Sequence, residues 1–174
     1  MSTALFLTEG GVAGHMMHLY DNTGLTFSEM KKILMAAASG QLKGTEKTDG
    51  QNLFISYSIK DGRAKAARNK SNIKKGGLDA NELATKFAGR GSVQKAFVEA
   101  FQVFEAACRS LPMNKQLKIF GRDADIFYNA EIQDPRNANI INYDSKTLNI
   151  HRVGHAAFDR ESGKVIDLNI SENF

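Results

Sequence analysis

Lys47 lies in a segment of the kind where a lysine can be held for chemistry. It lies in Thr45-Glu46-Lys47-Thr48-Asp49-Gly50, beside the carboxylates of Glu46 and Asp49, on a glycine-containing turn that leads into an alternating apolar segment. A lysine amine becomes a nucleophile only when its proton is removed, which requires a partly desolvated, positively biased pocket that lowers its pKa. The turn therefore indicates either a covalent nucleophile at Lys47 or an exposed hairpin with an ordinary surface lysine.

A basic cluster begins 21 residues after Lys47. It consists of Arg68, Lys70, Lys74 and Lys75. Clustered cations bind phosphate and nucleic acid, and they also occur on solvated loops. The pattern is compatible with both interpretations.

Three further side chains are suited to binding. Glu131 interrupts the mostly apolar segment Ile126–Ile132, and a carboxylate there is either on the solvated face of a strand or held for function. His15 and His18 would share one helix face and can begin a metal site, but no third ligand is nearby. We expect the two histidines to pack or to form hydrogen bonds.

Capping residues and periodicity predict the elements before and after Lys47. Thr26-Phe27-Ser28-Glu29 has the form of a capping box, so we expect a core-facing helix that begins there and ends at Gly40. The alternation from Leu53 to Arg68 around Asp61-Gly62 predicts a β-hairpin. This hairpin would bring the basic cluster, predicted as a loop, next to the strand that follows Lys47.

Residues 79–111 are predicted to be helical, with an interruption at 89–91, an N-cap at Ser92 and a stop at Pro112. An apolar stripe predicts the core face of the second helix and a buried Cys108; its members are Val93, Phe97, Ala100, Phe101, Phe104, Ala107 and Cys108. The last third is predicted to form strands at 117–120, 125–133, 140–143, 148–151, 155–159 and 165–168.

The order of a helix, strands, a helical insert and more strands predicts one α+β unit built on antiparallel sheet. It would span 1–174, with an N-terminal extension and helix at 1–41 and a core at 42–174. The net charge of +4 is compatible with a polyanionic partner without requiring one. A single cysteine excludes an internal disulfide framework and a cysteine-rich zinc cluster and favours a reducing, cytoplasmic compartment. The sequence has no signal peptide pattern and no run of apolar residues long enough for a membrane span.

Four segments in order resemble the motifs of the covalent nucleotidyltransferases, the family of DNA ligases, RNA ligases and mRNA capping enzymes. They are Lys47-Thr48-Asp49-Gly50, Ala66-Ala67-Arg68-Asn69, Phe127-Tyr128-Asn129-Ala130-Glu131 and Ala156-Ala157-Phe158-Asp159. The spacing is most similar to that of the phage nick-sealing RNA ligases, and the resemblance covers residues 42–168. It implies a ligase-type adenylation domain of antiparallel sheets flanked by helices.

The resemblance also implies roles for individual residues. Lys47 would attack the α-phosphate of ATP and form lysyl-AMP, with Mg²⁺ offsetting the phosphate charge. Nucleotide contacts would come from Glu46 (adenine), Asp49, Gly50, Arg68 (phosphate), Glu131 (ribose) and Phe158 (base stacking). The AMP would pass to a 5′-phosphate end of RNA or DNA, which Lys70, Lys74 and Lys75 would contact.

The sequence departs from the family pattern in two places. Asn129-Ala130 replaces the glycine of the third motif, and the family's later Glu-Gly and Lys-x-Lys strands are not identifiable before Phe174, so we expect an incomplete core. Phosphate-binding lysines usually supply the main electrostatic term in phosphoryl transfer. The alternative is therefore a degenerate ligase-like domain that serves as a non-catalytic binding or structural module, such as a phage virion component in contact with phage structural proteins. A third alternative is an unrelated α+β protein with accidental motif matches.

Overall fold

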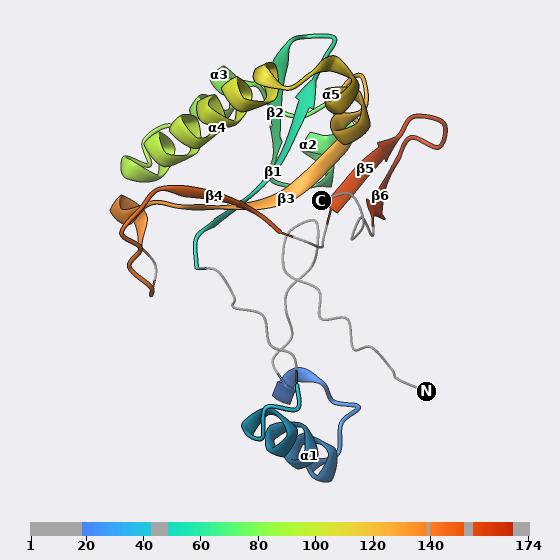
Figure 1. Ribbon diagram of the computed structural model, residues 1–174, viewed down its shortest axis with the longest axis vertical. Coiled ribbons are helices and arrows are strands. Elements are labelled where there is room, and N and C mark those ends of the chain that lie inside the picture. The colour runs from blue at the N-terminus through green and yellow to red at the C-terminus, as the bar shows by residue number, and fades with distance from the viewer. Residues whose placement is uncertain (1–18, 43–48, 139, 152–154, 169–174) are drawn as a thin grey trace.

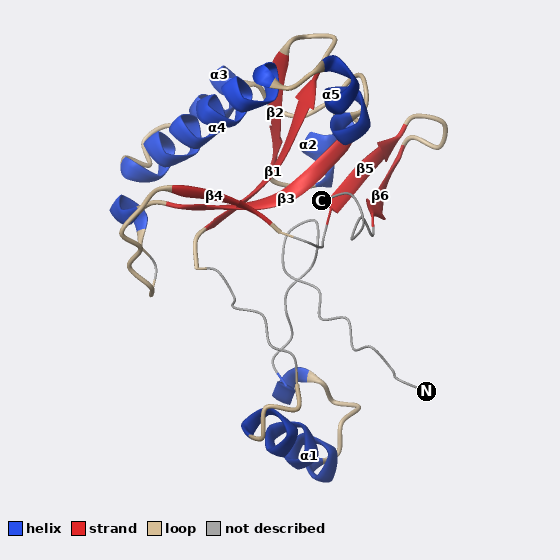
Figure 2. Ribbon diagram, in the orientation of Figure 1, coloured by secondary structure: helices blue, strands red, loops and turns tan. Residues whose placement is uncertain are grey.

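The chain forms an α+β structure in which an antiparallel sheet is flanked by helices, as the sequence predicted (Figure 1, Figure 2). The computed structural model describes residues 19–42, 49–138, 140–151 and 155–168. Four residues singled out from the sequence, His15, His18, Glu46 and Lys47, lie outside the described residues.

The described strands make one sheet in the order β2-β1-β3-β5-β6, with β4 paired to β3. Their bounds are β1 Gln51–Ser58, β2 Arg63–Ala67, β3 Ile126–Gln133, β4 Thr147–Ile150, β5 His155–Asp159 and β6 Lys164–Leu168. β4 pairs with Ala130–Gln133 of β3, whereas β5 pairs with Ile126 and Phe127. β3 is therefore the strand that links all the later strands to β1.

Helices precede the first strand and occupy segments between β2, β3 and β4. Their bounds are η1 Leu19–Asp21, α1 Phe27–Ala38, α2 Lys70–Lys74, α3 Ala80–Lys86, α4 Ser92–Ser110, α5 Met113–Phe120 and η2 Pro135–Asn137. α3 and α4 lie together over one face of the sheet (Figure 1). Within the part of the chain that the structure describes, no helix combines the length and apolar content that a membrane crossing requires.

Alternation along β1 and β3 builds a hydrophobic cluster on each face of the sheet. The larger cluster joins Leu53, Ile55, Tyr128 and Ala130 to the helices α3, α4 and α5. The smaller one joins Phe54 and Phe127 to Ile73 of α2, with Phe158 of β5 packed against it. Neighbouring residues of a strand point to opposite faces, so the two clusters share the same two strands.

The predicted hairpin and most of the later strands are confirmed. β1 and β2 pair in antiparallel register with Phe54 opposite Ala67, and Gly62 in their connection has a φ of +63°, which favours glycine. β3, β4, β5 and β6 lie where strands were predicted.

Three predicted elements are wrong. Residues 117–120 belong to helix α5 because Gln116 and Phe120, four residues apart, turn inward together. Residues 140–143 form no strand, since the amides of Ile140 and Ile141 donate to the Asp49 carboxylate instead of to a neighbouring strand. The basic loop after Arg68 is the short helix α2, which Asn69 caps at its N-terminus.

Helix α1 was predicted correctly in its span and wrongly in its burial. Thr26 and Glu29 form the expected capping box. No side chain of α1 is buried, and Phe27 is 90% exposed. The spacing of apolar residues decides which side chains share a helix face, but it does not decide what that face contacts.

Helix α4 was predicted almost to the residue. Its N-cap is Gly91 rather than Ser92, which is the first helical residue, and it ends before Pro112. Phe97, Phe101 and Cys108 are buried as expected, whereas Ala107 is exposed. Burial raises the pKa of the Cys108 thiol to about 12, which keeps it protonated at neutral pH.

The contrast between two helical phenylalanines is testable. Phe101→Ala should lower the free energy of unfolding by about 3–5 kcal/mol, because it empties a fully buried site in the larger cluster. Phe27→Ala should change it by less than about 0.5 kcal/mol, because the ring is exposed. Urea denaturation of both variants checks this, and a comparable loss for Phe27→Ala would mean that α1 is part of the core.

Cys108 should be unreactive in the folded protein. Because the thiol is buried and its pKa is raised, the thiolate that reacts with a disulfide reagent is almost absent at pH 8. We expect full reaction only after denaturant is added, as followed by absorbance. Rapid labelling of the native protein would contradict the burial.

Candidate functional site

Gly50, three positions after Lys47 and directly before β1, is hydrogen-bonded to the central strand β3. Its amide donates to Oε1 of Glu131 on β3 at 2.5 Å, across 81 residues of sequence. A Cβ atom at position 50 would lie 2.4 Å from the Ile132 carbonyl oxygen and 2.9 Å from Cγ of Glu131. Only glycine allows this close approach, so the glycine of the first resembling motif is required by the contact with the third.

Asp49 is hydrogen-bonded to the connection between β3 and β4. Its Oδ2 accepts the amides of Ile140 at 2.6 Å and Ile141 at 2.8 Å. Its own amide donates to the hydroxyl of Tyr143 at 2.9 Å. The side chain and the backbone of Asp49 are therefore both held by residues 140–143.

Glu131 is a buried carboxylate with a protein partner at each oxygen. It is 8% exposed and points to the face of β3 opposite from Ala130 and Ile132, which belong to the larger cluster. Its Oε2 lies 3.2 Å from Nε2 of His151, just after β4. A buried carboxylate needs such partners, because burial without them is strongly unfavourable.

Polar side chains flank Glu131 along the same face of β3. Asn129 accepts a hydrogen bond from Asn52 Nδ2 at 2.6 Å, and Gln133 accepts from Thr147 Oγ1 at 2.6 Å and Asn149 Nδ2 at 2.8 Å. We call Asn129, Glu131 and Gln133 the polar row. Of the three, only Glu131 was predicted from the sequence as a site residue. The alternation of the polar row with Tyr128, Ala130 and Ile132 is the signal that would have indicated the other two.

Arg68 faces the other side of the sheet. Its guanidinium lies 5.8 Å and 5.6 Å from the ring centres of Phe87 and Phe97, and Nη1 donates to the Asn52 carbonyl. Burial, and then the charge of Arg90, lower the pKa of Arg68. The structure thus brings Arg68 to the larger cluster rather than to Glu131.

Phe158 lies at the opposite end of β3 from Glu131. Ala157 pairs with Ile126, and the Phe158 amide donates to the Asp125 carbonyl at 2.8 Å, so Phe158 is opposite Asp125. Glu131 is six residues further along β3, a distance of about 20 Å at the usual rise of a strand. Phe158 and Glu131 are therefore not neighbours.

The basic side chains of α2 are accessible. Lys70, Lys74 and Lys75 are exposed, and Lys70 lies 3.7 Å from Asp167 of β6. Ile73 on the same helix is buried in the smaller cluster. The lysines thus project from the face of the sheet that also carries Glu131 and Phe158.

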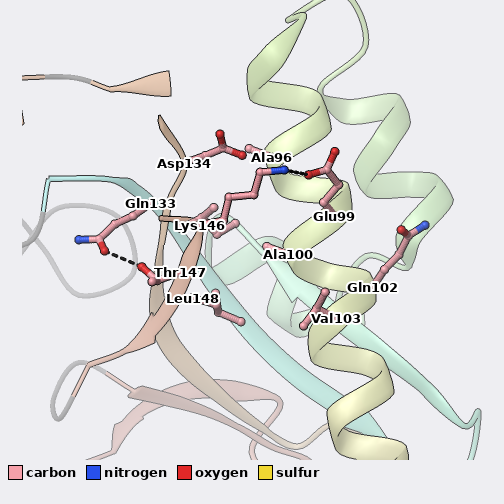
Figure 3. Close-up of a pocket in the computed structure, with 11 residues that line it drawn as sticks. Ala96, Glu99, Ala100, Gln102, Val103, Gln133, Asp134, Lys146, Thr147 and Leu148 are labelled. Carbon is pink, nitrogen blue, oxygen red and sulfur yellow. Dashed lines mark hydrogen bonds and ion pairs between the residues drawn. The ribbon is translucent and has the colours of Figure 1, made fainter. Parts of the chain in front are cut away.

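A cavity of about 380 Å³ lies elsewhere, between α4 and strands β3 and β4 (Figure 3). Ala100, Val103 and Leu148 line it, and Lys146 pairs with Glu99 across it at 2.8 Å. Gln133 turns away from α4 toward Thr147 at its edge (Figure 3). Among the described residues, none that was predicted from the sequence to form the site lines this cavity.

The described residues of the site provide hydrogen-bonding groups. Among residues 19–42, 49–138, 140–151 and 155–168, no group of three or more His, Cys, Asp or Glu side chains is placed to hold a metal ion. The carboxylates of Asp49 and Glu131 both accept backbone amides, Asp49 from Ile140 and Glu131 from Gly50. Comparison of the chain with protein-family models, with curated proteins and with solved structures finds no match.

Substituting Gly50 by alanine tests the close approach of position 50 to the Ile132 carbonyl. Gly50→Ala should lower the free energy of unfolding by about 1–3 kcal/mol, because the added Cβ meets backbone that cannot move aside. Gly24→Ala is the matched control, since its Cβ would lie 3.3 Å from a side-chain oxygen of Asn22, and we expect a change below about 0.5 kcal/mol. Equal stability of the two variants in chemical denaturation would contradict the contact with Ile132.

Proposed function

We propose that this chain is a ligase-like nucleotidyltransferase that forms a covalent lysyl-AMP at Lys47 from ATP, for sealing RNA or DNA ends. The observation that carries the proposal is the hydrogen bond between Gly50 and Glu131. It joins the segment resembling the nucleophile motif to the segment resembling the ribose-binding motif. Only Thr48 lies between Lys47 and Asp49 in the sequence, and two residue steps span at most about 7 Å.

The chemistry requires the amine of Lys47 to attack the α-phosphorus of ATP in line. A phosphorus–nitrogen bond forms, the bond to the bridging oxygen breaks, and its electron pair leaves with pyrophosphate, while the amine loses a proton. Mg²⁺, held mainly by the phosphates, would offset their charge. The AMP would then pass to a 5′-phosphate, from which a 3′-hydroxyl displaces it.

The residues around the turn are suited to fixing the attacking group. Asp49 and Gly50 are bonded to the β3–β4 connection and to Glu131, so the backbone just after the lysine is anchored at two successive residues. Precise placement of reacting atoms accounts for a large share of enzymatic rate enhancement. Exposed Lys70, Lys74 and Lys75 provide positive charge for a nucleic-acid end.

The second candidate is a degenerate ligase-like module without catalysis, serving in nucleic-acid binding or in a phage particle. It is favoured by Arg68 and Phe158, which pack into the two clusters and not beside Glu131. Both oxygens of Glu131 also have protein partners, which leaves fewer lone pairs for a ribose.

Labelling with ATP separates the two candidates. With α-³²P-ATP and Mg²⁺, the protein should take up label that acid releases and alkali does not, as expected for a phosphorus–nitrogen bond. Lys47→Ala should abolish the label because the nucleophile is gone. Lys43→Ala, which removes a lysine four residues away, should retain it.

The labelling result has two clear contrary outcomes. Label that survives Lys47→Ala would remove Lys47 from the mechanism. An unlabelled wild-type protein that still binds a 5′-phosphorylated oligonucleotide, with affinity falling in Lys70→Ala/Lys74→Ala/Lys75→Ala, would favour the non-catalytic module.

A further inference from the structure

The connection between β3 and β4 holds the turn that follows Lys47, although no sequence motif includes it. The hydroxyl of Tyr143 accepts the Asp49 amide at 2.9 Å, and the amides of Ile140 and Ile141 donate to the Asp49 carboxylate at 2.6 Å and 2.8 Å. We propose that Tyr143 is a positioning residue that fixes the backbone at Asp49, two positions after Lys47, for attack of the Lys47 amine on ATP. This inference rests on the proposed nucleotidyltransferase function.

The three hydrogen bonds restrain Asp49 in complementary ways. A carboxylate that accepts two backbone amides makes charge-assisted bonds, which are the stronger kind. These bonds fix the side chain, whereas the bond to Tyr143 fixes the backbone amide. Removing an acceptor from a partly buried amide is unfavourable, so we expect the backbone at Asp49 to shift if the hydroxyl is removed.

Gly50 is restrained separately from Asp49. Its amide is held by Glu131, which lies on β3 itself and not on the connection. The turn is thus fixed at Gly50 by the sheet and at Asp49 by residues 140–143. Loss of the Tyr143 hydroxyl should loosen the backbone at Asp49, while the bonds to the Asp49 carboxylate and to the Gly50 amide remain.

The position of Tyr143 predicts how it acts. The hydroxyl is bonded to the protein backbone, so the residue orients the turn through Asp49 and is not expected to contact ATP. A change in orientation alters the rate of the chemical step, whereas loss of a nucleotide contact alters the concentration of ATP that is needed. The two effects can be separated by kinetics.

Tyr143→Phe keeps the ring and removes only the hydroxyl. In single-turnover labelling, we expect the rate constant of lysyl-AMP formation at saturating ATP to fall about tenfold. The ATP concentration at half-maximal rate should change by less than about twofold. Tyr57→Phe is the matched control: it also removes a tyrosine hydroxyl, on the face of the sheet that carries the larger cluster and outside the four resembling segments, and it should leave the rate unchanged.

Amide hydrogen exchange tests the restraint without any need for activity. In Tyr143→Phe, the Asp49 amide should exchange at least about tenfold faster, with little change at Gly50. Unchanged exchange at Asp49, faster exchange without a slower reaction, or a parallel rise in the ATP requirement would each overturn the inference. A wild-type protein that takes up no AMP would overturn the proposed function and the inference together, and faster exchange at Asp49 would then show that the contact exists but serves only the fold.

Discussion

The burial of the Glu131 carboxylate is the constraint on which the described site depends. Burial of a carboxylate inside a sheet is unfavourable without polar partners, and here they come from segments far apart in the sequence. The Gly50 amide before β1 donates to one oxygen, and Nε2 of His151 after β4 lies 3.2 Å from the other. The Glu131 carboxylate is therefore the point on β3 where Gly50, before β1, and His151, after β4, meet. The approach is so close that position 50 has no room for a side chain.

The rest of the sheet makes this point rigid. β3 lies between β1 on one edge and β4 and β5 on the other, so its polar row is supported from both sides. The opposite face of the same strand is part of the larger hydrophobic cluster under α3, α4 and α5. A site on such a strand is held more exactly than a site on a loop, and residues 140–143 then connect the lysine turn to this frame through Asp49.

The same geometry separates residues that the resemblance would have grouped. The guanidinium of Arg68 lies over Phe97 because a residue next to Ala67 in the hairpin points to the opposite face. Phe158 completes the smaller cluster because β5 pairs with the beginning of β3. A nucleotidyltransferase built on this chain would therefore lack the Arg68 guanidinium and the Phe158 ring beside Asp49 and Glu131. This separation is the reason for a non-catalytic alternative.

The sequence by itself determined what depends on near neighbours. The capping box at Thr26 starts α1, glycine at position 62 permits the hairpin turn, and alternation along β3 separates Glu131 from Ala130. Only the tertiary structure decided that α1 is exposed, that 117–120 is helical, and that Tyr143 meets Asp49 across 94 residues. Local spacing specifies which side chains share a face, but the partner of that face depends on strand register and on contacts between distant segments.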